Sequence, residues 1–378
     1  MMSKLESLTY KSAGVNNALK EKCSKLFYEA SKNTWENRKG RVGEIQSGYD
    51  SFSGFRNIDI SNLNDAVAGT CSDGIGTKQV IAQRLSSYTK DFAYHKGIMH
   101  DLFAMPIEDA LVRGAEPVLI NWTINFNKPN FELAEYLAQG SLDAAKIARV
   151  AIFNGETADL GNIIGGFGAQ RYIADATVFW VANKKRIIDG KAVKEGDKII
   201  AFKEEGFRSN GLTLVRKIGG KSFGRSWHEK EINGKNIAKL ALIPSRIYCP
   251  AVVDMFGGYG MEPRANVHAV AHITGGGIPE KIKRALAPSG LGAIIYKQFE
   301  PSEPIKLFQE LGKVKDLEAY KTWNMGNGMM VITDEPEKVI SIAKEYNIEA
   351  KEAGEITKGP EIMLKNMGMY SKGEYLPF

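Results

Sequence analysis

The chain has 378 residues, of which 43% are hydrophobic and 25% are charged, so it can bury large cores and is expected to form two domains. Its formal net charge is +6 at pH 7, and the basic residues are scattered among acidic ones, which argues against nucleic-acid binding and suits small anionic substrates. The three cysteines lie far apart and form no CxxC pair, which argues for a reducing compartment and against a structural zinc site. The sequence shows no hydrophobic signal core and no apolar run of membrane-spanning length. We therefore expect a cytoplasmic protein without a membrane partner.

The first 60 residues form an irregular extension, apart from a helix expected over roughly 17–32. Residues 38–55 hold four glycines among polar residues and have few apolar anchors. Such a stretch is either a loop that becomes ordered on a ligand or a partner subunit, or a plain surface linker. Composition does not separate these two interpretations.

The most informative stretch follows the short apolar run 65–68, which is typical of a strand. Residues 69–78 then bring a carboxylate, glycines, a hydroxyl and a lysine into a turn, and apolar residues at helical spacing follow. Glycines let a ligand approach the backbone, and a helix N-terminus offers free N–H groups to an anion. Asp73 is suited to hold Mg²⁺ and Lys78 to neutralise phosphate oxygens. The alternative is a simple glycine turn with a capping Asp73 and a surface Lys78.

A second acidic feature lies on the amphipathic helix expected over 98–111. Asp101 and Glu108 are two turns apart and therefore share one face of this helix. They are candidates for a metal site, although a solvated acidic face is the commoner explanation of such a pair. In either case we expect Asp101 on the wet side of the helix.

Two strands follow in the first half of the chain. Residues 118–126 alternate between apolar and polar side chains, which predicts a strand with one polar face that a partner subunit could cover. A helix is expected over roughly 131–149, and the buried strand 150–153 then ends beside Glu156. Together with Asp73 and Asp101, Glu156 suggests a shared site for a divalent cation and phosphate.

The second half of the chain restarts near residue 184 and contains two further glycine turns. Ser209 or Asn210 can cap the helix expected over 212–218, which explains the first turn without any function. The strand 267–273 ends in three glycines, 275–277, before a helix with proline in its first turn. Three glycines at a helix N-terminus favour a phosphate cradle over a plain turn.

Taken together, these motifs resemble those of the aminoimidazole ribonucleotide synthetases, also called phosphoribosylformylglycinamidine cyclo-ligases, over nearly the whole chain. The motifs that carry the resemblance are Tyr10-Lys11-Ser12-Ala13-Gly14-Val15, Asp73-Gly74-Ile75-Gly76-Thr77-Lys78, Asp101 with Asp109, Gly114-Ala115-Glu116-Pro117, Gly155-Glu156-Thr157-Ala158, Ser209-Asn210-Gly211, His272-Ile273-Thr274-Gly275-Gly276-Gly277 and Asn324-Met325-Gly326. The resemblance implies an α/β fold with an extension (1–60), an ATP-binding domain (61–183) that dimerises through its sheet, and a C-terminal α/β domain (184–378). It also implies a homodimer that uses ATP and Mg²⁺ to close the imidazole ring of a ribonucleotide substrate.

The resemblance assigns provisional roles to named residues. These are metal binding by Asp73, Asp101 and Glu156; ATP and phosphate binding by Lys11, Asp73, Gly74, Gly76, Thr77 and Lys78; substrate binding by Ser209, Asn210, Gly275, Gly276 and Gly277; and catalysis by Lys78, Asp101 and Arg208.

The chain departs from the family pattern at four of the positions compared. Arg208 replaces the usual His, Asn154 a Gly, Glu108 an Asn and Lys281 an Asn. Because a guanidinium keeps its proton near neutral pH, we expect Arg208 to face the substrate cleft as an electrostatic clamp. These departures leave open a paralogous ATP-dependent enzyme that activates another amide or phosphate. A nucleotide-binding protein without catalysis is the third alternative, and it has less need of three carboxylates.

Overall fold

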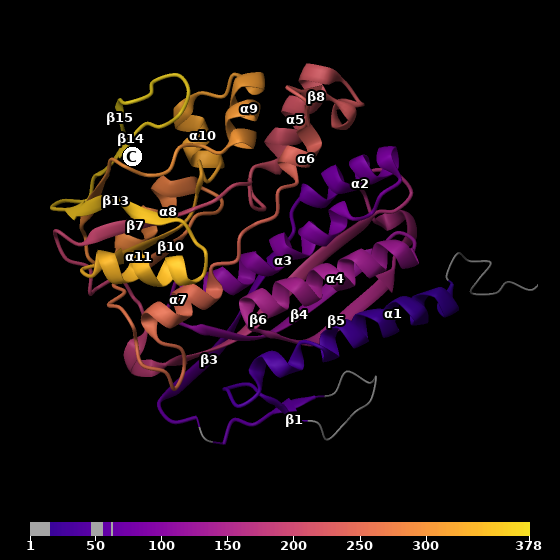
Figure 1. The fold of residues 1–378 in the computed structure, drawn as a ribbon, viewed down its shortest axis with the longest axis horizontal. Helices are drawn as coiled ribbons and strands as arrows, with labels where there is room; N and C mark the ends of the chain where they lie inside the picture. The colour runs from indigo at the N-terminus through magenta and orange to yellow at the C-terminus, as the bar shows by residue number, and fades with distance from the viewer. Residues whose placement is uncertain (1–15, 47–55, 62) are drawn as a thin grey trace, which may run out of the picture.

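The computed structural model describes residues 16–46, 56–61 and 63–378. Its two larger β-sheets have four and seven strands, and each is flanked by helices (Figure 1). The first sheet uses strands between residues 66 and 183, and the second uses strands between 198 and 377. The chain is therefore a mixed α/β protein. The expected Lys11 and residues 47–55 of the glycine-containing loop lie outside the described residues.

The first sheet has the strand order β3-β6-β4-β5, in which β4 and β5 are parallel and β6 is antiparallel to both of its neighbours. Its strands are β3 (Ala66–Gly74), β4 (Glu116–Phe126), β5 (Ala151–Asp159) and β6 (Tyr172–Asn183). The helices of this half are α1 (Asn17–Lys32), α2 (Lys78–Thr89), α3 (Tyr94–Leu111) and α4 (Phe131–Ala148). Helices α3 and α4 lie over one face of the sheet, whereas α1 lies beside the edge strand β5 (Figure 1).

The opposite face of this sheet carries the polar side chains expected from the alternation in β4. Asn121 is exposed, and Thr123 and Asn125 are half-buried, while the residues between them are buried against the helices. The polar face continues across the sheet, because the hydroxyls of Ser72 and Thr177 lie 2.7 Å apart on the neighbouring strands.

Helix α3 is buried on nearly every side, which its sequence pattern did not predict. Asp101 and Glu108 both have 0% of their surface exposed. The solvated acidic face and the wet position of Asp101 were therefore wrong. The reason is that α3 is covered from several directions: it contacts the first sheet, α4, and also α7 (Cys249–Phe256) and β10 (Ala269–His272) of the second half.

The second sheet has the order β10-β12-β7-β13-β11-β14-β15, and its strand pairs are antiparallel except for β11 with β14. Its remaining strands are β7 (Lys198–Lys203), β11 (Gly292–Ile295), β12 (Asn327–Thr333), β13 (Ala350–Thr357), β14 (Ile362–Lys365) and β15 (Tyr375–Pro377). Its remaining helices are α5 (Leu212–Phe223), α6 (Ile237–Ala241), α8 (Gly277–Leu286), α9 (Glu303–Gly312), α10 (Asp316–Thr322) and α11 (Pro336–Glu345). Two small hairpins complete the fold, β1 (Ile45–Gln46) with β2 (Asn57–Ile58) and β8 (Glu231–Ile232) with β9 (Lys235–Asn236).

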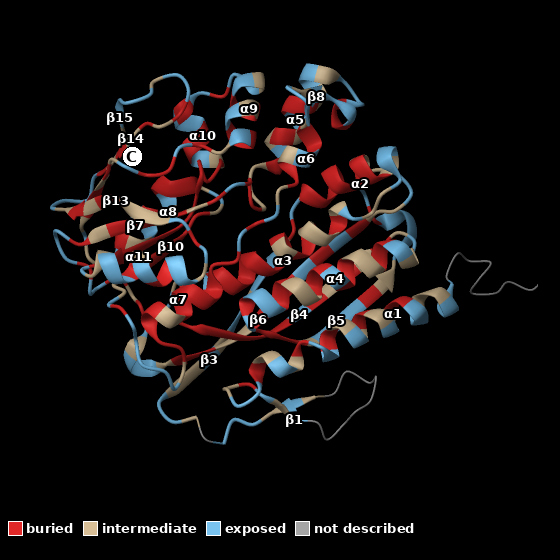
Figure 2. Ribbon diagram, viewed as in Figure 1, coloured by how far each residue is buried: buried red, intermediate tan, exposed pale blue. Residues whose placement is uncertain are grey.

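The junction of the two halves is built around α3 and is rich in buried residues (Figure 2). Apolar residues of both sheets belong to one continuous hydrophobic cluster, so the halves are held together by a shared core. Among the described helices, none is long and apolar enough to cross a membrane.

Candidate functional site

The turn between β3 and α2 holds the first of the residues expected to bind phosphate. Strand β3 runs to Gly74 and α2 begins at Lys78, so Asp73 is the penultimate residue of the strand. The backbone N–H of Gly74 donates to Asp73 Oδ1 over 2.7 Å. Burial raises the pKa of Asp73, and the nearby charge of Asp109 raises it further, while Lys281 acts in the opposite direction. Two carboxylates and a lysine from both halves of the chain thus interact here.

Lys78 and Asp101 form a buried ion pair. The Lys78 ammonium lies 2.8 Å from the Asp101 carboxylate, and neither side chain is exposed at all. Lys78 also donates to the carbonyl oxygen of Ile243, and Asp101 accepts bonds from the backbone N–H and the hydroxyl of Ser245. The alternative of a surface lysine was therefore wrong. The pair ties α2 and α3 to a loop of the second half.

The turn Ser209–Gly211 docks onto α3. The N-cap of α5 is Gly211, with a φ of 73° and no side-chain cap, so the expectation that Ser209 or Asn210 caps this helix was wrong. Instead, the Ser209 hydroxyl donates to the carbonyl oxygen of Asp101 over 3.5 Å, and the Asn210 amide lies 3.9 Å from the sulfur of Met105.

The same turn also meets the loop that precedes α2. The hydroxyls of Thr77 and Thr213 lie 3.3 Å apart. A Cβ atom placed on Gly76 would lie 3.4 Å from the carbonyl oxygen of Ser209. Loops that are more than 130 residues apart in the sequence therefore form one wall.

The three glycines 275–277 serve different purposes. A Cβ on Gly276 would overlap a carboxylate one turn later in α8, at 1.9 Å, and a Cβ on Gly277 would overlap a backbone carbonyl of α10, at 1.8 Å. Both residues have positive φ, of 89° and 63°. Packing and backbone conformation therefore explain these two. Gly275 differs, because a Cβ there would meet only the Asn210 side chain, at 3.4 Å.

A groove of about 350 Å³ opens beside these loops, between the two halves of the chain. Asp109 contributes a carboxylate from α3, and Lys281 and Arg284 contribute cations from α8. Arg113 adds a third cation, and residues of β3 and β10 line the remainder. Such a set can hold a divalent cation and several phosphate oxygens at the same time.

His272, at the end of β10, holds the Asp109 carboxylate. Its Nδ1 lies 2.9 Å from Asp109 Oδ1; the His272 side chain is 2% exposed and that of Asp109 is 46% exposed. Burial alone would raise the pKa of Asp109, but the hydrogen bond from His272 and the charges of Lys281 and Arg284 outweigh it, so the pKa lies below its usual value. Burial lowers the pKa of His272 to about 4, so the ring is neutral near neutral pH.

Arg208 lies behind His272 and is fully buried, so the expectation that it faces the cleft was wrong. Its guanidinium donates to Glu108 over 2.6 Å and to Glu204 over 2.8 Å, and its Nη2 lies 3.0 Å from His272 Nε2. Burial would lower the pKa of Arg208, but the two carboxylates outweigh that and raise it. Two departures from the family pattern, Glu108 and Arg208, are thus direct partners.

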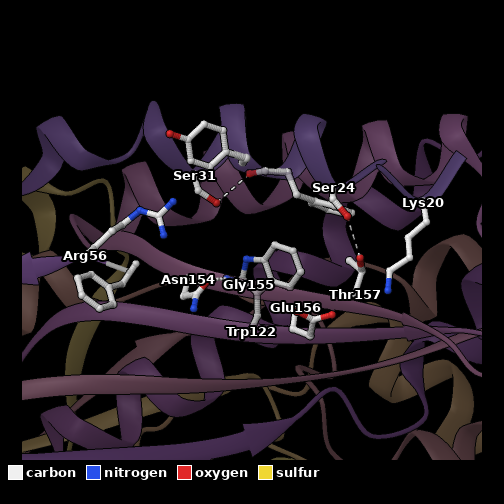
Figure 3. Close-up of a pocket in the computed structure, with 12 residues that line it drawn as sticks. Lys20, Ser24, Ser31, Arg56, Trp122, Asn154, Gly155, Glu156 and Thr157 are labelled. Atoms are coloured by element: carbon white, nitrogen blue, oxygen red, sulfur yellow. Dashed lines mark hydrogen bonds between the residues drawn. The ribbon is translucent and has the colours of Figure 1, made fainter. Parts of the chain in front are cut away.

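Glu156 lies far from Asp73, because β5 and β3 are the opposite edges of the first sheet. It lines a different pocket of about 330 Å³ between α1 and the sheet, into which Lys20 and Arg56 also point (Figure 3). Of the described residues, no group of three His, Cys, Asp or Glu side chains could hold a metal ion. The shared site expected from Asp73, Asp101 and Glu156 is therefore not formed within this chain.

Sequence reasoning missed five charged or titratable residues of the groove as site residues. These are Asp109, Arg113, His272, Lys281 and Arg284. Asp109 and His272 were visible inside the quoted motifs, so the motifs were sufficient to find them. Lys281 was noted only as a departure from the family pattern, and Arg113 and Arg284 carried no sequence signal.

Comparison with known protein families matches both halves of the chain. Residues 63–179 match the N-terminal domain of AIR synthase related proteins, and residues 194–365 match the C-terminal domain of the same proteins. A phosphoribosylformylglycinamidine cyclo-ligase of Thermococcus kodakarensis is 31% identical over 96% of this chain and 99% of its own length. That of Methanocaldococcus jannaschii is 32% identical over 94% of each chain.

Solved structures share the fold at low sequence identity. A hydrogenase maturation protein HypE in complex with ATP superposes with a TM-score of 0.62 at 12% identity, covering 98% of this chain and 97% of that one. Thiamine-monophosphate kinase from Stenotrophomonas maltophilia superposes with a TM-score of 0.60 at 12% identity, covering 91% of this chain and 96% of that one.

Proposed function

The chain belongs to the family of AIR synthase related proteins, and on that premise we propose that it is an ATP-dependent cyclo-ligase of de novo purine synthesis. It would convert formylglycinamidine ribonucleotide to aminoimidazole ribonucleotide, with release of ADP and phosphate. The curated relatives that support this proposal carry the cyclo-ligase name and match nearly the whole chain. The groove between the halves is the structural observation that supports it, because the Asp109 carboxylate and three cations converge there.

The proposed reaction suits a site of this composition. ATP phosphorylates the amide oxygen of the substrate. The amidine nitrogen of the same molecule then attacks the carbon of the phosphorylated amide and expels phosphate. Because ring closure is intramolecular, the protein has mainly to position groups and stabilise phosphoryl charge. The cations Lys281, Arg284 and Arg113 are placed to neutralise that charge. No protein nucleophile is needed for these steps.

Asp73 and Asp109 are the residues that would hold Mg²⁺. Beyond burial, the charges of Asp109 and Asp175 raise the pKa of Asp73, so like charges disfavour its ionisation. A divalent cation relieves such repulsion, and carboxylate oxygens are the ligands that Mg²⁺ prefers. When bound, the ion would neutralise phosphate oxygens of ATP. We propose this pair in place of Asp101, whose carboxylate is occupied by Lys78 and Ser245.

The remaining proposed contacts of described residues come from the loops beside the groove and not from its lining. The backbone at Gly74, Gly76 and Thr77 would approach phosphates, as would Lys11 outside the described residues. Ser209, Asn210 and Gly275 would contact the ribonucleotide, since Gly275 leaves room for a ligand beside Asn210. Lys78, Asp101 and Arg208 support these loops from beneath and would act through them.

We also propose that the protein acts in the cytoplasm as a homodimer formed through the first sheet. The face opposite α3 and α4 carries the polar side chains of β4 and, at the end of β6, Ile173 with 40% of its surface exposed. A second copy of the same sheet could cover this face and bury the polar side chains of β4 together with Ile173.

The test is release of ADP from ATP in the presence of formylglycinamidine ribonucleotide and Mg²⁺. We expect turnover with this substrate, and Asp109→Asn is expected to lower kcat by roughly 100-fold. Glu337→Gln, on the exposed face of α11, is the matched control and should behave like the parent. ADP release with another amide, but none with this ribonucleotide, would instead indicate the paralogous enzyme.

A further inference from the structure

Behind the groove lies a closed set of charges that the proposed chemistry does not use directly. The Arg208 guanidinium contacts Glu108 and Glu204, and none of the three side chains has more than 1% of its surface exposed. Arg208 also donates to the carbonyl oxygen of Arg246, and the backbone N–H of Tyr248 donates to Glu108. When both glutamates are ionised, one guanidinium and two carboxylates leave one negative charge in excess, removed from solvent. Burial raises the pKa of Glu108 to about 7, so Glu108 can take up a proton near neutral pH and cancel that excess.

The contact between Arg208 and His272 determines which ring nitrogen of His272 carries the proton. Arginine has five N–H donors and no acceptor, and it stays protonated. Across the 3.0 Å contact, Arg208 must therefore donate and His272 Nε2 must accept. The ring proton is then on Nδ1, which donates to Asp109 Oδ1 over 2.9 Å.

The opposite tautomer, with the proton on Nε2, also has a hydrogen-bond acceptor nearby. Glu108 Oε2 lies 3.4 Å from His272 Nε2, so a proton on Nε2 could be donated to that carboxylate if the guanidinium were absent. The lone pair of Nδ1 would then face the Asp109 carboxylate, and the two would repel each other. Arg208 therefore selects between two arrangements of the same three side chains.

We propose that Arg208 is a positioning residue: by fixing His272 as the Nδ1–H tautomer, it orients the Asp109 carboxylate toward the groove. Glu204 and Glu108 hold the guanidinium in place, so the series of hydrogen bonds from Glu204 through Arg208 and His272 to Asp109 acts as one unit. The effect on turnover rests on the proposed function, whereas the effect on the histidine does not.

The direct test measures the tautomer of His272 by ¹⁵N NMR on the full chain, in which His272→Gln identifies the signal among the five histidines. In the parent we expect Nδ1–H. In Arg208→Lys, which still only donates, we expect the same tautomer. In Arg208→Met, which offers no donor to Nε2, we expect the proton to move to Nε2 at a pH high enough to ionise Glu108, and kcat for ADP release to fall by about 10- to 100-fold, with KM for ATP changed less.

Arg208→Met leaves two buried carboxylates without a cation and can fail to fold. The second variant, Arg208→Met with Glu204→Gln, keeps one excess negative charge at a pH that ionises Glu108, and Glu108 can then accept the proton from Nε2. It should show the same Nε2–H tautomer and the same loss of kcat. The matched control is Glu116→Gln, which breaks another fully buried arginine–glutamate pair, Glu116 with Arg38 at 2.9 Å, away from the groove. It should lower stability but not kcat per folded molecule.

Two results would overturn the proposal. One is a His272 ring that stays Nδ1–H in Arg208→Met and in the double variant at a pH that ionises Glu108. The other is a tautomer that changes while kcat per folded molecule stays at the parent value, because Asp109 then does not depend on His272. A parent protein that shows Nδ1–H but releases no ADP would instead count against the cyclo-ligase activity and leave the positioning intact.

Discussion

The ammonium of Lys78 lies 2.8 Å from the carboxylate of Asp101, and neither side chain reaches solvent. One residue comes from the start of α2 and the other from the middle of α3, and both also bond the loop that contains Ile243 and Ser245. Sequence reasoning gave each of them a separate role at phosphate. In the fold they neutralise each other and fix three segments around the groove.

Replacing Asp101 with Asn should therefore destabilise the protein as well as stop ATP turnover. Breaking one side of a buried ion pair leaves the ammonium of Lys78 uncompensated, which costs about 3–5 kcal/mol in the free energy of unfolding. Urea denaturation followed by circular dichroism measures this loss. The double variant Asp101→Leu with Lys78→Met should regain most of the stability without regaining turnover. An Asp101→Asn protein as stable as the parent would show that Lys78 finds another partner.

How far the sequence predicted the site can be judged from α3 and its neighbours. Local pattern identified a strand before Asp73, a helix after it, the glycine turns and the polar face of β4. The strand runs on to Gly74, however, so Asp73 belongs to the strand and not to the expected turn.

The pattern also showed that Asp101 and Glu108 share a helix face, because that follows from 3.6 residues per turn. It could not show what covers that face, since Arg208 and Ser245 lie 100 or more positions away and even Lys78 is 23 positions away. For the same reason the pairing of Glu108 with Arg208 was invisible, although each residue was recognised as unusual.

A buried histidine should make the protein less stable in mild acid. Burial lowers the pKa of His95 to about 3, and its Nδ1 lies 2.9 Å from the Tyr172 hydroxyl. Between pH 6.5 and that value the unfolded chain binds a proton at this residue and the folded chain does not, so stability falls as the pH falls. From pH 6.5 to pH 5 the contribution is about 2 kcal/mol.

Thermal or urea unfolding at several pH values measures this dependence. His95→Gln should make the decline between pH 6.5 and pH 5 shallower without abolishing it, because His272, whose pKa burial lowers to about 4, contributes a similar decline. Tyr172→Phe, which keeps the histidine, should leave the slope in place. If His95→Gln declines as steeply as the parent, other groups carry the acid sensitivity.

The proposed dimer can be disrupted at the centre of the polar sheet face. Thr177 lies between Ser72 of β3 and Asn121 of β4 in the sheet register. Thr177→Lys would place a flexible charge in the middle of the face and should convert a dimer to a monomer in sedimentation velocity at micromolar concentration. Glu337→Gln on α11 also raises the net charge by one unit, at an exposed position elsewhere, and should remain dimeric. A parent protein that sediments as a monomer with full activity would refute the dimer altogether.

Substitutions of Gly275 and Gly277 should distinguish an effect on ligand binding from an effect on folding. At Gly275 an added methyl group would meet only the Asn210 side chain, at 3.4 Å, so Gly275→Ala should change the free energy of unfolding by less than about 0.5 kcal/mol. The methyl group would nevertheless occupy space beside Asn210, where the ribonucleotide is proposed to bind, and should raise the KM for the ribonucleotide by about tenfold.

At Gly277 the φ of 63° and a carbonyl oxygen at 1.8 Å leave no room, so Gly277→Ala should lose more than about 2 kcal/mol of stability. Steady-state kinetics and urea unfolding on both variants check the contrast. If Gly275→Ala leaves the KM for the ribonucleotide unchanged, the ribonucleotide binds elsewhere, because a ligand beside Gly275 would contact the added methyl group.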